Sequence, residues 1–200
     1  MPDANGDANM TRPSPGPRER LLTAGQHLFY AHGVAVGVDA LLKEAKVARR
    51  SLYEHFSGKD GLVAAVLHRT AEEDLAWYDA ALAAADEPRE RLLGLFDRLD
   101  ELVANDDFRG CRYFASDVAL EDPDHPAHAE TEGFRRRLRE RLMRELEAMD
   151  HADPEHAADQ LHLLIEGTLV MGAPQDDRHP ARAAHDLAAL ALGWGGASWR

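Results

Sequence analysis

Residues 38–56 read VDALLKEAKVARRSLYEHF and contain two short apolar patterns with helical spacing. In the first pattern the apolar residues recur at i, i+3, i+4 and i+7, which places them on one helical face: Val38, Leu41, Leu42 and Ala45. In the second pattern Leu52 and Phe56 are four residues apart. The few residues between the two patterns leave room only for a tight turn, so the stretch predicts a helix-turn-helix.

The second of these helices has a polar and basic outer surface. Arg49, Arg50 and Tyr53 point away from its apolar face, and Ser51 and His55 lie on the flanks. Guanidinium, phenol, hydroxyl and imidazole groups on one exposed face suit contacts with phosphates and base edges in a DNA major groove. An ordinary helical hairpin with solvated arginines would show the same spacing, so the two helices alone leave both interpretations open.

The flanking residues add a family resemblance. From Arg18 to Leu67 the chain resembles the DNA-binding domain of the TetR (tetracycline-repressor) family, in which an alanine-rich helix ending L-F-x-x-x-G precedes a helix-turn-helix that closes on L-Y-x-H-F-x-x-K. The residues that carry the resemblance are Ala24, Leu28, Phe29, Gly33, Val38, Leu41, Ala45, Val47, Ser51, Leu52, Tyr53, His55, Phe56, Lys59 and Leu62. It implies a DNA-binding transcriptional regulator, by the family's habit a repressor.

Three positions depart from the family pattern. Lys46 stands where a glycine usually precedes the turn valine, so it must accept any backbone strain there. Ala48 replaces the usual Ser or Thr at the start of the recognition helix, which costs about 1 kcal/mol of helix stability. Gly37 replaces the hydroxyl residue that usually caps the preceding helix, a milder loss.

A further region that could contact DNA follows the recognition helix. Ser57 and Gly58 break the chain, and a long helix is predicted from Lys59 or Asp60 to about Ala85. Lys59 and the free N–H groups of that helix start would clamp a phosphate. The family uses this helix as a lever between its two domains. We therefore expect DNA contacts from Gly37, Ala48, Arg49, Arg50, Ser51, Tyr53, His55 and Lys59.

The charge distribution agrees with this expectation. The net charge of the whole chain is −13. Residues 11–70 hold nine basic and five acidic residues, a net charge of +4, residues 1–10 carry −2, and residues 71–200 hold 14 basic and 29 acidic residues, a net charge of −15. One end of the molecule therefore attracts a polyanion and the other repels it, which confines DNA contact to the smaller unit.

Composition points to an intracellular protein. Cys111 is the only cysteine, which excludes an internal disulfide and fits a reducing compartment. Residues 1–10 lack the basic start and apolar core of a signal peptide. No apolar run approaches the roughly 20 residues that span a bilayer. We expect a soluble cytoplasmic protein without membrane contact, and nothing in the sequence calls for a cofactor.

The rest of the chain has helical periodicity only, so the predicted fold class is all-α. A disordered tail (1–16) precedes a three-helix DNA-binding domain (17–60) and a larger helical bundle for ligand binding and dimerisation (61–200). Helix one begins near Pro17 and stops at Gly33, and Arg12, Arg18 and Arg20 are solvated or touch the DNA backbone. Further helices are expected at 88–104, 108–120, 130–149, 154–171 and 180–194, with a loop at 122–128. The arginines of RRRLRERLMREL alternate with glutamates, which favours a solvated face of i,i+4 pairs over a second nucleic-acid surface.

Dimerisation follows from the DNA interpretation, because one short helix reads only half a site and two related by a two-fold axis read a palindrome. The last two helices are expected to form a four-helix interface with their symmetry mates, through Leu161, Leu164, Gly167, Ala184, Leu187, Ala188 and Ala191. The resemblance also implies a small-molecule pocket that controls release from double-stranded DNA. Its candidate lining residues are Trp77, Tyr78, Phe96, Cys111, Phe114, Met143 and Leu164, although plain core is the favoured interpretation for each of them.

Three alternatives remain at this point. Cys111 lies beside Arg109 and Arg112 near a predicted helix start, where a thiolate would be favoured, so a repressor that responds to electrophiles or oxidants is one; a buried small hydrophobe is the plainer interpretation. The histidines of DPDHPAH could bind a metal, but their spacing matches no known site, so no metal is expected. An all-helical enzyme or ligand carrier is the third; no phosphate loop, nucleophile elbow or zinc signature supports an enzyme.

Overall fold

The computed structural model describes residues 15–174 and 179–193, and over these ranges the chain forms nine α-helices and no strand. The predicted all-α fold is confirmed. In chain order the helices are α1 (Pro17–His32), α2 (Val38–Ala45), α3 (Arg49–Phe56), α4 (Lys59–Leu82), α5 (Pro88–Val103), α6 (Arg112–Ala119), α7 (Ala127–Ala148), α8 (Pro154–Gly172) and α9 (Pro180–Ala191). Residues 1–14, which include Arg12 and most of the predicted tail, lie outside the described residues.

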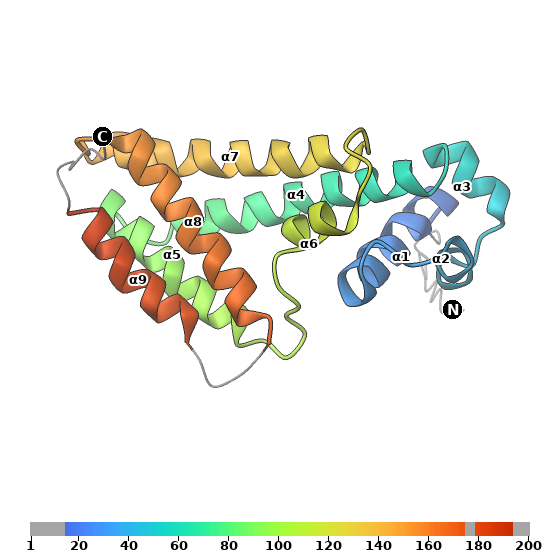
Figure 1. Ribbon diagram of the computed structural model, residues 1–200, viewed down its shortest axis with the longest axis horizontal. Helices are drawn as coiled ribbons and strands as arrows, with labels where there is room; N and C mark the ends of the chain where they lie inside the picture. The colour runs from blue at the N-terminus through green and yellow to red at the C-terminus, as the bar shows by residue number, and fades with distance from the viewer. Residues whose placement is uncertain (1–14, 175–178, 194–200) are drawn as a thin grey trace, which may run out of the picture.

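The molecule is elongated, with a small helical unit at one end and a larger bundle at the other (Figure 1). Helices α1, α2 and α3 make the small unit, and the start of α4 packs against α1 and α3. Helices α4 and α7 run side by side along the long axis. Helices α5, α8 and α9 pack together at the far end, and α6 lies against α7 near the middle.

The small unit folds around apolar side chains that the sequence pattern singled out. Leu21, Leu41 and Leu52 come from three different helices and are completely buried. Helix α1 lies so close to α4 that a Cβ on Gly25 would stand 2.7 Å from Cγ2 of Val66, so this crossing requires a glycine. The helix-turn-helix is thus held from behind by α1 and α4, which fixes the direction in which α3 presents its outer surface.

Ion pairs between α4 and α7 reinforce the long axis of the molecule. Arg137 holds Glu72 with two of its nitrogens, and Nε and Nη2 of Arg141 lie 2.6 and 2.8 Å from the carboxylate oxygens of Asp79. The predicted i,i+4 pairs within the arginine-rich helix are therefore largely replaced by pairs to a neighbouring helix. Only tertiary structure could show this, because the partners are more than 60 residues away in sequence.

Several predicted boundaries shift for local reasons. The helix expected from Phe108 begins at Arg112 instead, because Gly110 has a φ of +94° that no helix allows and Cys111 caps the helix start. Helix α7 begins at Ala127, directly after Pro126, so the predicted loop ends two residues early and His128 is helical. The last helix ends at Ala191, and Trp194 lies outside the described residues. No helix among the described residues has the length and apolarity to cross a membrane.

Candidate nucleic-acid interface and internal pocket

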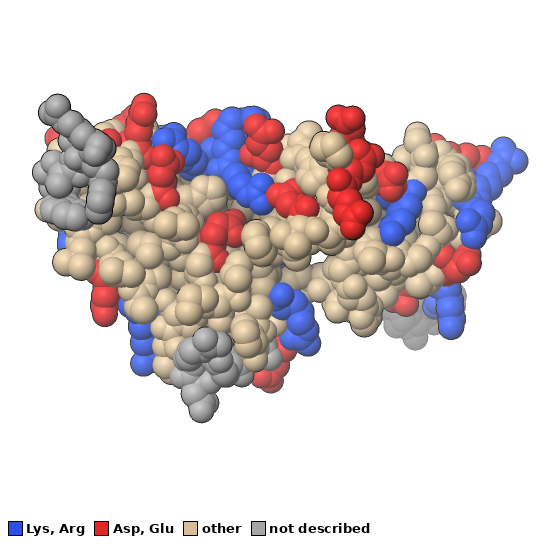
Figure 2. All heavy atoms as spheres, viewed as in Figure 1, with Lys and Arg blue, Asp and Glu red and all other residues tan. Residues whose placement is uncertain are grey.

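The outer surface of α3 is open to solvent. Leu52 and Phe56 face the core, whereas Arg49, Arg50, Tyr53 and His55 are exposed and Ser51 lies half-buried on the flank. The side chain of Tyr53 is one of the few large apolar groups left open, with 56% of its surface exposed. Figure 2 shows Lys and Arg gathered at this end of the molecule, while basic and acidic groups mix over α7.

Both arginines of α3 are held by nearby carboxylates. Nη2 of Arg49 lies 2.6 Å from Oδ1 of Asp39 on α2, and Nε of Arg50 lies 2.5 Å from Oε1 of Glu54 one turn along α3. These pairs are solvent-exposed, with 90% of the Asp39 side chain open to water, so each is worth about 1 kcal/mol or less. The pairs hold the two guanidinium groups in position. Because each pair is weak, an incoming anion can replace the carboxylate with little loss of free energy.

The starts of α2, α3 and α4 share one property: none has a side-chain cap. Gly37, Ala48 and Gly58 occupy the capping positions, so no capping side chain takes up the first-turn N–H groups of these three helices. Lys59 is half-buried at the start of α4. Such ends attract phosphate through their free N–H groups and the positive end of the helix dipole.

Two further arginines, both on α1, contact the helix-turn-helix from the side of α1. Nη1 of Arg20 donates to the carbonyl oxygen of Lys46 at 3.0 Å, where the chain turns between α2 and α3. The Arg18 guanidinium stacks over the ring of Phe56, 5.5 Å from its centre. Lys46 itself has a φ of 53° and ψ of 48°, so it does accept the left-handed conformation expected at this position.

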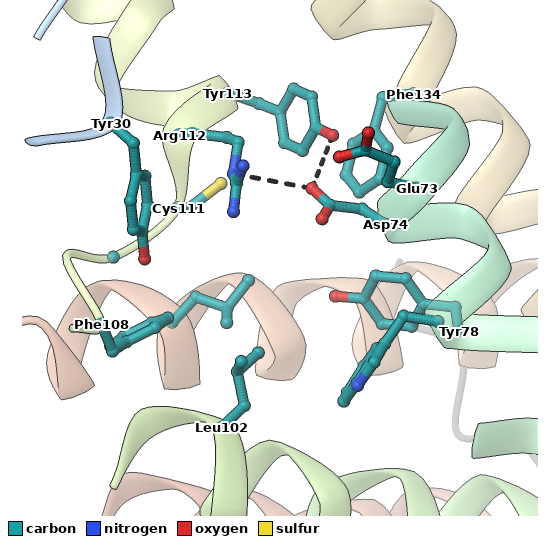
Figure 3. Close-up of a pocket in the computed structure, with 13 residues that line it drawn as sticks. Tyr30, Glu73, Asp74, Tyr78, Leu102, Phe108, Cys111, Arg112, Tyr113 and Phe134 are labelled. Atoms are coloured by element: carbon teal, nitrogen blue, oxygen red, sulfur yellow. Dashed lines mark hydrogen bonds and ion pairs between the residues drawn. The ribbon is translucent and has the colours of Figure 1, made fainter. Parts of the chain in front are cut away.

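An internal pocket lies where α1, α4, α6, α7 and α8 meet (Figure 3). It has a volume of about 290 Å³ and is lined mainly by aromatic and apolar side chains. Its polar groups are few: the carboxyl groups of Glu73 and Asp74, the Arg112 guanidinium and the tyrosine hydroxyls. The full lining is Tyr30, Glu73, Asp74, Trp77, Tyr78, Leu102, Phe108, Gly110, Cys111, Arg112, Tyr113, Phe134 and Leu169.

Asp74 is the centre of the polar contacts in this pocket. The Tyr113 hydroxyl donates to its Oδ2 at 2.7 Å, and Nε of Arg112 lies 3.6 Å from the same oxygen. Burial raises the pKa of Asp74, and the nearby Arg112 and Tyr113 offset only part of that effect. Burial, followed by the charge of Asp74, raises the pKa of Tyr78 well above its usual value, so this phenol is neutral.

Similarity to known proteins identifies the family. Residues 21–66 match the family model described as bacterial regulatory proteins, tetR family. A crystal structure of a putative TetR transcriptional regulator from Streptomyces avermitilis is 34% identical in sequence, with a TM-score of 0.75 over 87% of this chain and 98% of that one. The chain belongs to the TetR family. It is therefore a helix-turn-helix DNA-binding transcriptional regulator, and the resemblance found in its first third is confirmed.

Two further TetR relatives give context. The transcriptional repressor ComR of Escherichia coli K12 is 27% identical over 166 residues, which cover 78% of this chain and 79% of ComR. A cysteine mutant of the regulator CifR, solved with 26-base-pair double-strand operator DNA, is 23% identical, with a TM-score of 0.71 over 91% of this chain and 98% of CifR. At this level of identity the CifR likeness shows the fold.

The predicted ligand-binding residues of this TetR protein are divided by the structure. Trp77, Tyr78 and Cys111 line the pocket. Phe96 is buried elsewhere in the core, the side chain of Phe114 is 48% exposed, and neither contributes to the lining. Met143 and Leu164 pack against the core outside the pocket. Sequence reasoning missed Tyr30, Asp74, Arg112 and Tyr113, because only the packing of α1, α4 and α6 brings them to one place.

The expectation that Cys111 favours a thiolate is wrong. Burial, followed by the negative charge of Glu166, raises the pKa of the thiol to about 12. The two neighbouring arginines do not lower it, because the Arg112 guanidinium stacks over the Tyr30 ring at 4.4 Å and Arg109 donates to the carbonyl oxygens of Asp106 and Phe108. The Cys111 sulfur instead accepts a hydrogen bond from the Phe114 N–H and starts α6.

Some of the residues predicted at the dimer interface are buried within the subunit, and others lie at its surface. Leu161, Ala184, Ala188 and Ala191 are buried within the subunit, where the alanines let α9 pack closely on α5 and α8. Their side chains pack in the core of the subunit itself. Leu187 is exposed, Gly167 has open space around its Cα, and Leu164 is half-buried. The sequence missed the exposed apolar residues of the same two helices, namely Leu163, Val170, Met171 and Leu190.

The histidines of the predicted loop have structural partners. The His125 ring is buried with Nε2 3.4 Å from Oδ1 of Asp60, and Nδ1 of His128 lies 2.9 Å from Oδ1 of Asp117. Thr131 and Arg135 also bind Asp117. Over residues 15–174 and 179–193 no group of three or more His, Cys, Asp or Glu side chains is arranged to hold a metal ion.

Proposed function

We propose that this protein acts as a homodimeric repressor that binds an inverted-repeat operator and leaves it when a small molecule enters the internal pocket. The observation that carries the proposal is the outer surface of α3, where Arg49, Arg50 and Tyr53 are exposed while the opposite face is buried. Ser51, His55, Lys59 and the uncapped starts at Gly37 and Ala48 would add phosphate and base contacts. The operator complex of CifR, a protein of the same fold, supports this mode of binding.

The outer face of α8 and α9 is our candidate for the dimer contact. This face, defined by Leu163, Val170, Met171, Leu187 and Leu190, holds five of the eight large apolar side chains that the structure leaves exposed among the described residues. An apolar patch of this kind on two adjacent helices is typical of a protein contact. Paired with its symmetry mate, it gives a four-helix interface and a two-fold axis, which is the symmetry that an inverted repeat requires.

The pocket reaches the DNA-binding unit through Tyr30 of α1. The Tyr30 ring forms part of the pocket wall and stacks on Arg112, and its hydroxyl accepts a hydrogen bond from the Arg109 N–H at 2.8 Å. A ligand that moves the residues before α6 therefore acts directly on α1. Release requires only that the ligand favour the subunit arrangement that does not fit DNA by a few kcal/mol.

We accordingly propose residues 17–60 as the DNA-binding unit and residues 61–200 as the effector-binding and dimerisation unit. Helix α4 begins in the first and belongs for most of its length to the second, with contacts to α1 and α3 near one end and to α5 and α7 beyond. One rigid helix thus transmits movement of the bundle to the α3 surface. A regulator of this kind works beside the chromosome, so we propose a cytoplasmic location.

The DNA proposal is tested with the inverted repeats found upstream of the gene and its neighbours. Fluorescence anisotropy should show salt-sensitive binding of the wild-type protein to one of them, and the double variant Arg49→Ala, Tyr53→Ala should lose at least about a hundredfold in affinity. Arg136→Ala is the matched control, since Arg136 is exposed on α7 and has no ion-pair partner among the described residues. Equal affinity of wild type and double variant, with both folded by circular dichroism, would refute DNA reading by α3.

The dimer proposal is tested on the same protein without DNA. Leu163→Glu together with Leu187→Glu places charges in the outer face of α8 and α9, so sedimentation should change from dimer to monomer. Val118→Glu on α6 is the control, because Val118 is equally exposed but lies on another helix. A double variant that remains dimeric would assign the dimer contact elsewhere.

A further inference from the structure

The chemistry of the pocket lining specifies a class of ligand for this effector site. Six aromatic rings line it: Tyr30, Trp77, Tyr78, Phe108, Tyr113 and Phe134. Trp77 and Tyr78 meet edge to face with ring centres 5.0 Å apart, and Tyr113 stacks on Phe134 at 3.8 Å. Such walls accept an aromatic or apolar body and, through the negative faces of the rings, also attract a positive charge.

One carboxylate oxygen in the pocket is left without a partner. Asp74 uses Oδ2 for its contacts with Tyr113 and Arg112, whereas Oδ1 makes no hydrogen bond to the part of the chain that the structure describes. In Figure 3 the Asp74 carboxyl group extends from α4 toward the open space between Arg112 and Tyr78. Arg112 approaches no closer than 3.6 Å, which is longer than a charge-assisted hydrogen bond. The negative charge of Asp74 is thus only partly compensated.

A second polar group in the pocket is also unpartnered. Tyr78 is 4% exposed, and its hydroxyl has no hydrogen-bond partner within the described ranges 15–174 and 179–193. Figure 3 shows this hydroxyl pointing into the pocket. A buried hydroxyl without a partner costs free energy that a ligand donor or acceptor recovers. Its position opposite Asp74 places two oxygen acceptors around the same space.

The surrounding charges favour a cation over an anion. Asp74 and Glu166 both act on Tyr78 as negative charges, and Glu166 acts in the same way on Cys111. The nearest cation, Arg112, is already placed against Asp74 and over the Tyr30 ring, and Glu73 faces Arg69 and Gln26. An entering carboxylate would have to displace Asp74 from Arg112, whereas an entering ammonium group would meet a free oxygen directly.

We propose that the pocket takes an organic cation: an aromatic or apolar body that carries a protonated amine, with the amine donating to Oδ1 of Asp74 and to the Tyr78 hydroxyl. The inference rests on the proposed effector function and adds the ligand class to it. The ring faces of Trp77 and Tyr78 hold the body, and Asp74 selects the charge. A neutral molecule of the same shape gains the aromatic contacts without the attraction between opposite charges.

Three probes of one shape test the charge selection: phenylbutylamine, phenylbutanol and phenylbutyrate, titrated calorimetrically into the full-length protein at neutral pH. The amine should bind at least about tenfold more tightly than the alcohol, because a partly buried charge pair is worth more than 1.4 kcal/mol, and the acid should bind least. In Asp74→Asn the amine and the alcohol should bind alike. Tyr78→Phe should weaken the amine more than the alcohol and leaves the ring in place.

Asp79→Asn is the matched control, since Asp79 lies on the same helix but faces Arg141 outside the pocket; its preference for the amine should equal that of the wild type. An amine that binds wild-type protein no better than the alcohol, or a preference for the acid, overturns the proposal. So does an amine preference that survives in both Asp74→Asn and Tyr78→Phe. The titrations use no DNA, so failure of operator binding would count against the repressor function and leave the ligand class standing.

Discussion

Arginine-rich helices occur at two places in this molecule, and they do different work. Helix α3 carries Arg49 and Arg50 at the end of the small unit, while α7 carries RRRLRERLMREL through the middle of the bundle. On α3 the arginine partners are exposed carboxylates of the same helix-turn-helix. On α7 the partners belong to α4, α6 and α8, and the Arg141 side chain is only 14% exposed.

This difference shows that the arginines of α3 are available for binding, whereas those of α7 hold the bundle together. Exposed pairs such as Arg50 with Glu54 are weak, so a phosphate can replace the carboxylate with little loss. The pairs of Arg137 and Arg141 each join two helices, so replacing their carboxylates would loosen the bundle. Arginine content therefore does not identify a DNA surface in this protein; the position and burial of the carboxylate partner do.

Charge reversal on the two helices should give the largest contrast. Arg50→Glu should lower operator affinity by about a hundredfold or more, because each subunit of the proposed dimer loses a cation and gains a repelling anion beside the phosphates. Arg137→Glu should leave operator affinity within about twofold, since α7 lies away from the α3 surface, and should lower the melting temperature. Anisotropy with operator DNA and thermal unfolding measure both effects. Equal losses of operator affinity in the two variants would contradict the assignment of DNA binding to α3 and of a structural role to α7.

The junction of α6 and α7 should give the next largest effect. Asp117 accepts hydrogen bonds from the Thr131 hydroxyl at 2.8 Å and from Arg135, and it contacts His128. Burial raises its pKa, but these three partners together hold it below the usual value. Asp117→Asn removes the charge and one acceptor, so urea unfolding should show a loss of about 2 kcal/mol. A loss no larger than that of Asp186→Asn, an exposed position on α9, would show that the junction contributes little.

The next effect, the contribution of ion pairs to the pH dependence of stability, should be smaller. It should be present for the ion pairs of α7 and absent for those of α3. Hydrogen bonding to Arg137 lowers the pKa of Glu72, and hydrogen bonding to Arg141 lowers that of Asp79. A carboxylate whose pKa is lower in the folded than in the unfolded state stabilises the protein above about pH 4. This stabilisation is lost as the pH falls through the folded-state pKa. The Asp79 contribution is reduced by solvent screening to about 1 kcal/mol or less, since the side chain is half exposed.

Unfolding free energies at neutral pH and near pH 3 measure this contribution. Arg141→Ala should lose stability at neutral pH and should narrow the difference between the two conditions. Arg50→Ala on α3 should leave that difference unchanged, because Arg50 and Glu54 are both exposed and solvent screens their interaction. An Arg141→Ala protein with the full wild-type acid dependence would contradict the assignment of Asp79.

The sequence predicted the small unit better than the bundle, for a physical reason. The apolar spacing of Val38, Leu41 and Ala45, and of Leu52 and Phe56, predicted two helices that the structure places at Val38–Ala45 and Arg49–Phe56. Those helices are short, and the buried residues of each, Leu41 and Ala45 on α2 and Leu52 and Phe56 on α3, face one core. Periodicity therefore determined both their positions and their outer surfaces.

In the bundle, periodicity shows which residues share a face but not what that face contacts. The alanines of α9, which were predicted at a dimer interface, are buried against α5 and α8 within the subunit, while Leu187 and Leu190 are exposed. The pocket depends on meetings between distant segments, such as Asp74 with Arg112 and Tyr30 with Arg109. Nothing local to Asp74 or Arg112 marks either residue as part of a site.

The smallest expected effect concerns the turn between the two helices of the DNA-binding unit, and it has the opposite sign. Lys46 holds a left-handed conformation, with a φ of 53°, in which a side chain is disfavoured and glycine is not. Lys46→Gly should therefore stabilise the protein by about 0.5 kcal/mol, a gain reduced by the greater freedom of glycine in the unfolded chain. The hydrogen bond from Arg20 to the backbone carbonyl of residue 46 is kept, because it does not involve the side chain. Lys43→Gly, a substitution in the last turn of α2, is the control and should destabilise by up to about 1 kcal/mol. If both glycines destabilise equally, the turn carries no strain at Lys46, and the departure from the family pattern at this position has no cost.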